Sequence, residues 1–289
     1  MTILVNPRID LCFKKLFGST ENKAILIDFI NSIVSKADQV VDITLLNPYN
    51  ERAFEGDKLS ILDIKAKDTG GKLFNIEIQI SDQEDYDKRA LYYWAKLYSD
   101  QMKAGKSYRT LKKTIGIHVL NFLSIPEKKD YHSVFSIRDL ETNQQKFKDF
   151  ELHTIELIKF DEHTPDDIQS IVANIGQKLD LWVAFLTKYQ VLHQNPLPPQ
   201  IDNPVVGKAL SILAHMSLTD IEKERYESGE KWFLDEEAIL HRVRKEGIEQ
   251  GFEQGVKKIA KNMLSKGFSK EDIQDCTGLS YEKIAELAD

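Results

Sequence analysis

Two acidic residues and a glutamine have the types and spacing best suited to chemistry, and they lie within LDIKAKDTGGKLFNIEIQIS (62–81). Asp63 and Glu77 flank Thr69-Gly70-Gly71, a sequence typical of a hairpin turn. With that turn between two antiparallel strands, we expect Asp63 to face Glu77, with both carboxylates on one side of the sheet. Together with the backbone carbonyl of Ile78, they would form a hard-oxygen site for a divalent cation.

Gln79 projects from the same strand face as Glu77, two residues further on. A divalent cation at this site would lower the pKa of its bound water and clamp a phosphoryl oxygen. The amide of Gln79 is suited to orienting an attacking water rather than deprotonating it. The alternative interpretation is a solvated sheet face, because polar residues that alternate along a strand usually face water. Spacing alone favours that alternative.

Adjacent strands are needed to position these residues, and apolar and polar residues do alternate over 57–68 and 73–81. In the first run, Leu62, Ile64 and Ala66 are predicted to share one face. The surrounding pattern predicts helices over 10–17, 22–34 and about 84–104, and further strands over 38–48, 114–123, 131–138 and 149–158. This order predicts an α/β domain with a mixed sheet flanked by helices.

The chain after residue 160 is predicted to be helical, with helices over 165–193, 204–216 and about 235–266. The proline-rich stretch HQNPLPPQIDNP (193–204) is typical of a linker. We therefore expect three parts: an α/β domain over 1–160, a helical region over 161–234, and a long helix with a small tail over 235–289.

The tail at 268–288 has the pattern of a helix-turn-helix, with Ser269 and Ser280 as N-caps and Thr277-Gly278 as the turn. Residues 266–289 contain three lysines and six acidic residues, which disfavours a groove-reading helix and favours a packing or protein-contact module.

Composition excludes several classes of protein. The chain has 289 residues and a formal net charge of −7, so a polyanion site would have to be a local basic patch. Cys12 and Cys276 are far apart and form no CxxC metal motif, which fits a reducing cytoplasm. The N-terminus lacks a signal-peptide pattern, and no apolar run is long enough to span a membrane. We expect a cytoplasmic protein without a membrane partner.

Several motifs occur in a characteristic order: D-x-x-F-K-x-x-F-G (10–18), L-D-I-x-A-x-D (62–68), N-I-E-I-Q (75–79), R-A-x-Y-Y (89–93), G-x-x-Y (105–108) and I-E-L-I-K-F (155–160). Over about residues 6–160 the chain resembles the recombination-promoting nuclease/transposase family of the PD-(D/E)XK nuclease superfamily. This resemblance implies a restriction-endonuclease-like core and DNA cleavage that depends on Mg²⁺ or Mn²⁺.

The resemblance also implies roles for single residues. Asp63 matches the central aspartate of the motif and Glu77 its second acid, whereas Gln79 stands where the superfamily more often has lysine. A neutral amide lacks the charge of a lysine, and Lys65, one pleat from Asp63, is a candidate to supply it; the alternative is a solvated lysine. Asp10 is a candidate to complete the metal shell, and its alternative is a helix cap or dipole partner.

The segment from 86 to 113 is basic, with eight Lys or Arg against two Asp, and tyrosines are interleaved. Basic side chains contact phosphates and tyrosines can stack on bases, so DNA is the expected partner. The candidate DNA-binding residues are Arg89, Tyr93, Lys96, Lys103, Lys106 and Arg109. The alternative is that the aromatic residues are core and the charges solvate the outer face; a helix can do both.

Two other features concern packing. His118, within the apolar IGIHVL, is predicted to be a hydrogen-bonded core residue. Gly247, Gly251 and Gly255 lie four apart on one helical face, and each glycine costs a helix roughly 1 kcal/mol relative to alanine. That repeat predicts close helix pairing, in a homodimer through the C-terminal helices; the alternative is a surface helix.

The sequence thus predicts a metal-dependent DNA endonuclease associated with recombination or mobile elements. One alternative is a catalytically degenerate nuclease fold that binds nucleic acid or protein. The other is an interaction protein that self-associates through its helical tail.

Overall fold

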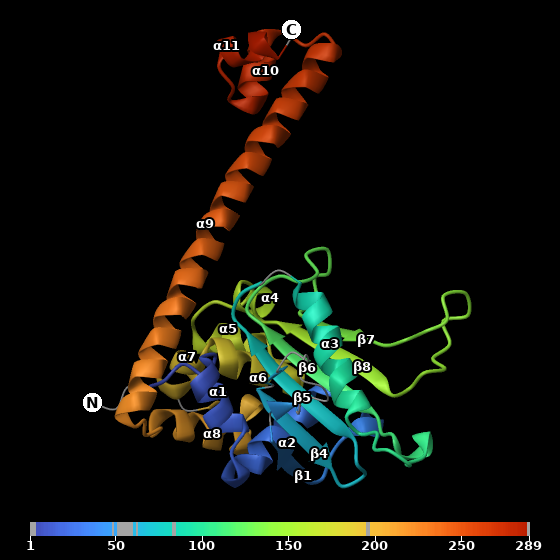
Figure 1. The fold of residues 1–289 in the computed structure, drawn as a ribbon. Helices are drawn as coiled ribbons and strands as arrows, with labels where there is room; N and C mark the ends of the chain where they lie inside the picture. Colours follow the sequence, from blue (N-terminus) through green and yellow to red (C-terminus); the bar gives the residue numbers. More distant parts are fainter. Residues whose placement is uncertain are drawn as a thin grey trace. The chain divides into compact units, whose positions relative to one another are not determined.

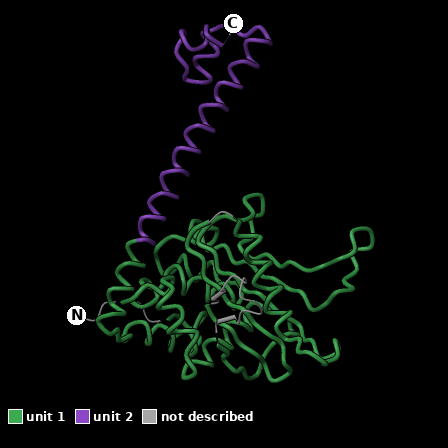
Figure 2. The backbone as a smooth tube through the Cα atoms, in the orientation of Figure 1, with its two compact units in different colours: residues 1–231 green, residues 232–289 purple. Residues whose placement is uncertain are grey.

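The computed structural model describes residues 4–47, 49–50, 60–61, 63–82, 85–194 and 197–287. Of the strand predicted over 57–68, residues 57–59 and Leu62 lie outside the described residues. The chain divides into two compact units, residues 1–231 and residues 232–289 (Figure 2). No helix among the described residues combines the length and apolar character that a membrane span needs.

Unit 1 contains a six-stranded mixed sheet with the strand order β1-β4-β5-β6-β8-β7 (Figure 1). Its strands are β1 (Ile43–Leu46), β4 (Ile64–Asp68), β5 (Leu73–Gln79), β6 (Thr114–Leu120), β7 (His132–Phe135) and β8 (Phe150–Glu156). β5, β6 and β8 are mutually parallel, and the remaining pairs are antiparallel. Two short strands, β2 (Tyr49–Asn50) and β3 (Ser60–Ile61), form a separate pair. The predicted α/β class with a mixed sheet is confirmed.

The β4–β5 hairpin has the register that the turn predicts, with Ile64 opposite Ile76 and Lys65 opposite Asn75. Gly71 has φ +91°, which side chains rarely adopt, and its N–H donates to Asp68 O at 3.1 Å. The predicted strand over 38–48 is shorter than expected. Residues Lys36–Asp38 form a 3₁₀ turn, η2, in which Asp38 pairs with Lys72 and Lys113, and β1 begins only at Ile43.

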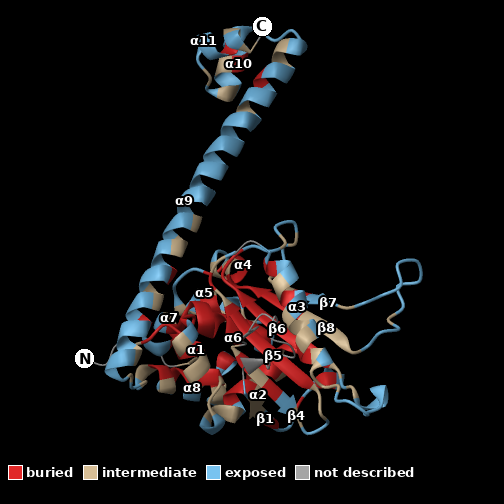
Figure 3. Ribbon diagram, viewed as in Figure 1, coloured by how far each residue is buried: buried red, intermediate tan, exposed pale blue. Residues whose placement is uncertain are grey.

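Helices cover both faces of the sheet (Figures 1 and 3). The helix α3 (Tyr86–Ser99) packs on β5 and β6. On the other side, α1 (Asp10–Phe17), α2 (Lys23–Ile33) and α6 (Lys178–Thr187) share an aromatic core in which Phe17 and Phe29 lie 5.7 Å from Trp182, ring centre to ring centre.

The strand β5 is therefore buried on both faces. Asn75 is 1% exposed and Glu77 is 3% exposed, although both alternate with apolar residues. The interpretation of a solvated sheet face is wrong for this strand, because α3 covers the polar side that the alternation pattern leaves open. Polar groups that are buried in this way need partners or a function.

Helices dominate after the sheet. They are α4 (Leu157–Asp161), α5 (Ile168–Ala173), α6, α7 (Tyr189–Gln194), α8 (Pro204–Ala214) and α9 (Asp220–Ser265), with a short 3₁₀ turn, η4 (Pro199–Ile201), before α8. Two further 3₁₀ turns lie earlier in the chain, η1 (Thr20–Asn22) before α2 and η3 (Tyr108–Thr110) before β6. The long helix begins at Asp220, well before the predicted start near 235. Thr219 and Glu222 explain this, since Thr219 N–H donates to Glu222 Oε2 at 2.9 Å in a reciprocal capping arrangement.

Unit 2 ends in two short helices, α10 (Lys270–Thr277) and α11 (Tyr281–Glu286). Ser269 and Ser280 cap them as predicted, and Gly278 ends α10 in the left-handed conformation at φ 69°. Ala260, Ile273 and Ile284 form their buried core. The predicted pair of capped helices is confirmed.

Candidate active site

Asp63 lies at the point where the β4–β5 ladder ends. The last paired residues are Ile64 and Ile76, so Asp63 is just outside β4. Its Oδ2 accepts a hydrogen bond of 2.8 Å from the backbone N–H of Ile78, an amide beyond the last pair of the ladder. The side chain of Asp63 is only 12% exposed. The end of the strand pair thus fixes this carboxylate beside β5.

Glu77 is the second carboxylate of the site. Its Oε2 accepts a long hydrogen bond of 3.4 Å from Gln79 Nε2, while its Oε1 is buried and has no hydrogen-bond partner among the described residues. Burial, and secondly the nearby Asp63, raise the pKa of Glu77 well above its usual value. Burial also raises the pKa of Asp63, despite the opposing charge of Lys14. A cation would relieve this accumulated negative charge.

The helix α1 brings a lysine to these acids. Lys14 Nζ lies 3.0 Å from Asp63 Oδ1 and 2.8 Å from Asp10 Oδ1. Asp10 is thereby linked to Asp63 by Lys14, which lies one helical turn after Asp10 and contacts both carboxylates. The N-cap of α1 is Ile9 and no side chain caps it, so the capping interpretation of Asp10 is wrong, although Asp10 does lie in the first turn. Metal binding by Asp10 stays a prediction.

Lys14 was not among the predicted site residues. The available signal was the D-x-x-F-K spacing, which places Asp10 and Lys14 on one helical face. That spacing shows a pair on the helix, but it does not show that the helix docks against Asp63.

Gln79 is held by Arg89 of α3. The guanidinium of Arg89 donates to Gln79 Oε1 at 2.7 Å, and the Gln79 amide NH₂ points to Glu77. The amide orientation is therefore set from both ends. Arg89, predicted to contact DNA, lies against Gln79 instead of standing alone on the helix surface; a DNA contact by Arg89 stays a prediction.

His118 lies next to Glu77 on β6 and is buried. Its Nδ1 is 2.9 Å from the hydroxyl of Tyr86, and burial lowers the pKa of His118 to about 3. The imidazole is thus neutral at ordinary pH. The prediction of a hydrogen-bonded core histidine is confirmed.

The remaining candidates lie along β4 and around α3. Lys65 is half-buried and lines a hollow of about 710 Å³ between the β4–β5 hairpin and the end of α3. Five lysines and one aspartate are among its lining residues: Lys65, Lys67, Lys103, Lys106, Lys112 and Asp100. Leu73 and Leu97 contribute apolar surface. The hollow is therefore suited to an anionic ligand.

Four predicted DNA-binding residues are not among those that line the hollow: Arg89, described above, and Tyr93, Lys96 and Arg109. Tyr93 is half-buried and packs against Leu73 and Leu97, and burial followed by the nearby Glu77 raises the pKa of its hydroxyl. Lys96 is half-buried on α3, and Arg109 is exposed on η3. The structure thus brings Asp63, Glu77, Gln79 and Asp10 together, and gathers Lys65, Lys103 and Lys106 separately.

The donor set fits a hard divalent cation. Within the described ranges no cluster of three or more His, Cys, Asp or Glu side chains is arranged to hold a metal ion. Magnesium sites in phosphate chemistry commonly use one or two carboxylates and complete their shell with water and substrate oxygens. Asp63 and Glu77, with the unpartnered Oε1, match that requirement. The carbonyl of Ile78 as a further ligand stays a prediction.

Comparison with known families gave two matches. The family model described as PD-(D/E)XK nuclease family transposase matches residues 7–243, which include every candidate residue of the site. The model described as Rpn/YhgA-like nuclease family, C-terminal HTH domain, matches residues 253–289 and so covers α10 and α11. No curated protein and no solved structure matched the chain.

Proposed function

Because this chain belongs to the PD-(D/E)XK nuclease family transposases, we propose that it hydrolyses DNA phosphodiester bonds with a bound divalent metal, in the cytoplasm and in the service of recombination or mobile elements. PD-(D/E)XK nucleases typically use such a metal. The observation that carries the proposal is the buried pair of Asp63 and Glu77, whose carboxylate charge has too little compensation within the described protein.

Each residue of the site has a proposed role. Asp63 and Glu77 would hold Mg²⁺ or Mn²⁺, with Asp10 and the Ile78 carbonyl completing the shell. The metal would supply an activated water and a positive charge for the phosphate oxygen. Gln79, held by Arg89, would orient that water through its amide.

DNA is the proposed partner. The lysines of the hollow, with Lys103 and Lys106 among them, provide phosphate contacts that position the duplex. The C-terminal match to an HTH domain also supports DNA binding. We assign most phosphate contacts to unit 1, because the tail carries three lysines against six acidic residues between 266 and 289.

We also propose the three-part division 1–160, 161–234 and 235–289, and a homodimer through the C-terminal helices. Ile248, Phe252 and Ile259 of α9 are each more than half exposed. No described atom comes within 4 Å of a Cβ built on Gly247, Gly251 or Gly255. The open space at these glycines would let the helix of a second copy of the chain pack closely there. Light scattering of the full chain tests this, and a monomer mass at micromolar concentration would contradict it.

The test of the function is a plasmid-cleavage assay with Mg²⁺, Mn²⁺, Ca²⁺ or EDTA. We expect nicking with Mg²⁺ or Mn²⁺ and none with EDTA, because the metal supplies the activated water. Calorimetric titration with Ca²⁺ should show binding that Asp63→Ala removes.

One alternative is a degenerate nuclease fold that binds without cleaving, and Gln79 in place of a charged residue is the observation that favours it. If purified wild-type protein binds metal and DNA but does not cleave DNA with any of the metals, this alternative would be supported.

A separate prediction concerns Arg89. Arg89→Met should lower the cleavage rate about tenfold, because one charge-assisted hydrogen bond to Gln79 is lost. DNA affinity measured in Ca²⁺ should change little. Lys88→Met is the matched control, since Lys88 is exposed and pairs with Asp85. Loss of DNA affinity at an unchanged cleavage rate would instead make Arg89 a DNA contact.

A further inference from the structure

Negative charge accumulates at the site when substrate binds there. Two buried carboxylates receive a negatively charged phosphodiester, and further negative charge develops on the phosphate oxygens during attack. Gln79, on the strand beside Glu77, is neutral and is already bonded to Arg89 and Glu77. A protein cation beside the acids would offset that charge.

Lys14 is in that position. Its ammonium lies 3.0 Å from the Oδ1 of Asp63, the carboxylate that we assign to the metal. An ammonium has three N–H donors, and the bonds to Asp63 and Asp10 use two of them. The side chain of Lys14 is 35% exposed, so a ligand can approach it from solvent.

The helix α1 fixes the base of this lysine. Phe13, Leu16 and Phe17 are fully buried, and the carbonyl of Lys14 accepts a hydrogen bond of 2.8 Å from Gly18 N–H. The ammonium end is held less firmly, because its second partner, Asp10, is 56% exposed, and exposed ion pairs contribute little. Lys14 can therefore exchange Asp10 for a phosphate oxygen at small cost.

We propose that Lys14 is a catalytic residue that contacts a non-bridging oxygen of the scissile phosphodiester and stabilises the charge that develops there. This inference rests on the proposed function. Water oxygen forms the new bond to phosphorus and the bond to the leaving sugar oxygen breaks. One proton of the water ends on that oxygen and the other passes to solvent. Lys14 keeps its protons throughout.

The experiment compares Lys14→Met, Lys14→Arg and the surface control Lys23→Met, whose lysine pairs with exposed Asp42. At saturating Mg²⁺, Lys14→Met should lower kcat about a hundredfold, as loss of one charge-stabilising donor does in other enzymes. Its Ca²⁺ affinity without DNA, measured by calorimetry, should stay within about threefold of wild type, because Asp63 and Glu77 are retained. Lys14→Arg should retain at least about a tenth of the wild-type kcat, since the charge is kept.

Several outcomes would overturn the assignment. A Lys14→Met protein with wild-type kcat at saturating Mg²⁺ would make Lys14 a mere counter-ion of the acid pair. Loss of Ca²⁺ binding, or a Lys14→Arg protein as inactive as Lys14→Met, would show that Lys14 maintains the site rather than contacting substrate.

A binding measurement separates this inference from the proposed function. If wild-type protein binds DNA but does not cleave it, the proposed function fails. The salt dependence of DNA affinity in Ca²⁺ then tests whether Lys14 contacts a phosphate. Lys14→Met should reduce the slope of log K against log salt by about one phosphate contact. An unchanged slope would overturn the Lys14 contact.

Discussion

Glu77→Gln should lower the DNA cleavage rate strongly and, in EDTA, make the protein more stable. The loss of one of two metal-holding carboxylates should lower the cleavage rate about a thousandfold, since metal stabilisation of the transition state is worth several kcal/mol. The gain in stability follows from burial. Burial and then Asp63 raise the pKa of Glu77, so ionised Glu77 is less favourable in the folded protein than in the unfolded chain.

The sign of the pH dependence follows from that shift. The ordinary glutamate pKa is about 4.3. Wild-type stability is complete below that pH and falls as pH rises through the higher pKa of folded Glu77. Glutamine carries no charge, so the advantage of Glu77→Gln should grow with pH, to about 1–2 kcal/mol at pH 8, the usual gain when a strained functional group is removed.

Chemical denaturation in EDTA at pH 5 and pH 8 measures this effect. Glu127→Gln is the matched control, because Glu127 is exposed. A Glu77→Gln protein that is less stable than wild type by equal amounts at both pH values would contradict the expected burial cost.

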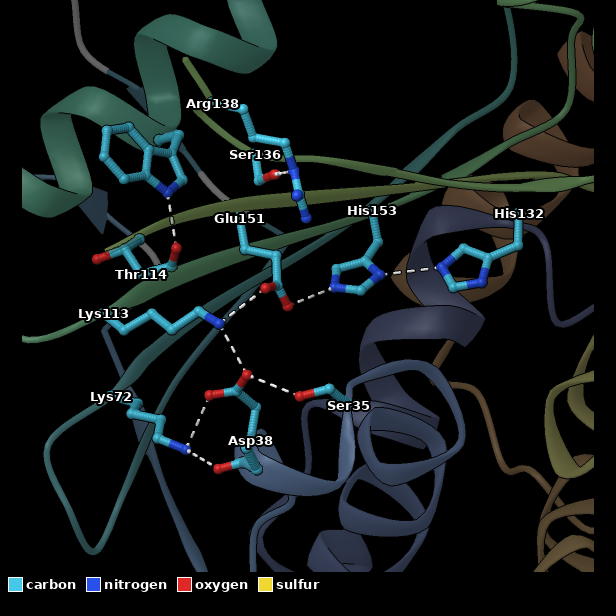
Figure 4. Close-up of polar contacts among 12 residues, drawn as sticks. Ser35, Asp38, Lys72, Lys113, Thr114, His132, Ser136, Arg138, Glu151 and His153 are labelled. Carbon is cyan, nitrogen blue, oxygen red and sulfur yellow. Dashed lines mark hydrogen bonds and ion pairs between the residues drawn. The ribbon is translucent and has the colours of Figure 1, made fainter. Parts of the chain in front are cut away.

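Lys113→Met should destabilise the fold by about 2–3 kcal/mol, below the roughly 3–5 kcal/mol typical of a fully buried pair. Lys113 Nζ lies 2.7 Å from Asp38 Oδ2 and 2.7 Å from Glu151 Oε2 (Figure 4). Removing it leaves two mostly buried carboxylates short of a partner. The loss is limited because Lys72 also binds Asp38 and because Lys113 is 18% exposed.

This cluster continues through the sheet. Glu151 Oε1 lies 2.9 Å from His153 Nε2, and His153 Nδ1 lies 2.9 Å from His132 Nε2 (Figure 4). Burial, the neighbouring His153 and then Lys128 lower the pKa of His132 to about 4, so His132 is neutral at ordinary pH. The cluster links η2, which follows α2, to the residue before β6 and to β8. Both strands lie on the opposite side of β5 from β4.

The stability lost in Lys113→Met should shrink in acid. Burial raises the pKa of Asp38, but the hydrogen bonds from Lys113 and Lys72 outweigh it and lower the pKa below its ordinary value; His153 and Lys113 do the same for Glu151. Their contribution is present above about pH 4, the ordinary carboxyl range, and is lost as pH falls through the lowered values.

Urea unfolding of wild type and Lys113→Met at pH 7 and pH 3 tests this. Lys112→Met, which removes an exposed neighbouring lysine, should be close to neutral. An equal difference between wild type and Lys113→Met at both pH values would contradict the ion-pair explanation.

The local elements were predictable because short-range interactions determine them. The turn at 69–71 sets the hairpin register, and this register alone placed Asp63 beside Glu77. The caps at Ser269, Ser280 and Gly278 also involve residues only a few positions apart. The early start of α9 had a local signal too, in Thr219 and Glu222, which the charged sequence around it obscured.

Contacts between distant elements decided the chemistry of the site. Alternation marks Glu77 as polar-facing, but only the docking of α3 turns that face into a buried one and raises the pKa of its carboxylate. The basic, tyrosine-rich segment 86–113 predicted Arg89 as a DNA contact, and the family resemblance made Lys65 a candidate for the missing charge. The packing of α3 and α1 on the sheet brought Arg89 to Gln79 and Lys14 to Asp63, two contacts that the sequence did not predict; the DNA contact by Arg89 and the role of Lys65 stay predictions. Hydrophobic periodicity specifies which face of a helix is buried, whereas the partner that its polar edge meets depends on how the helices pack against the sheet.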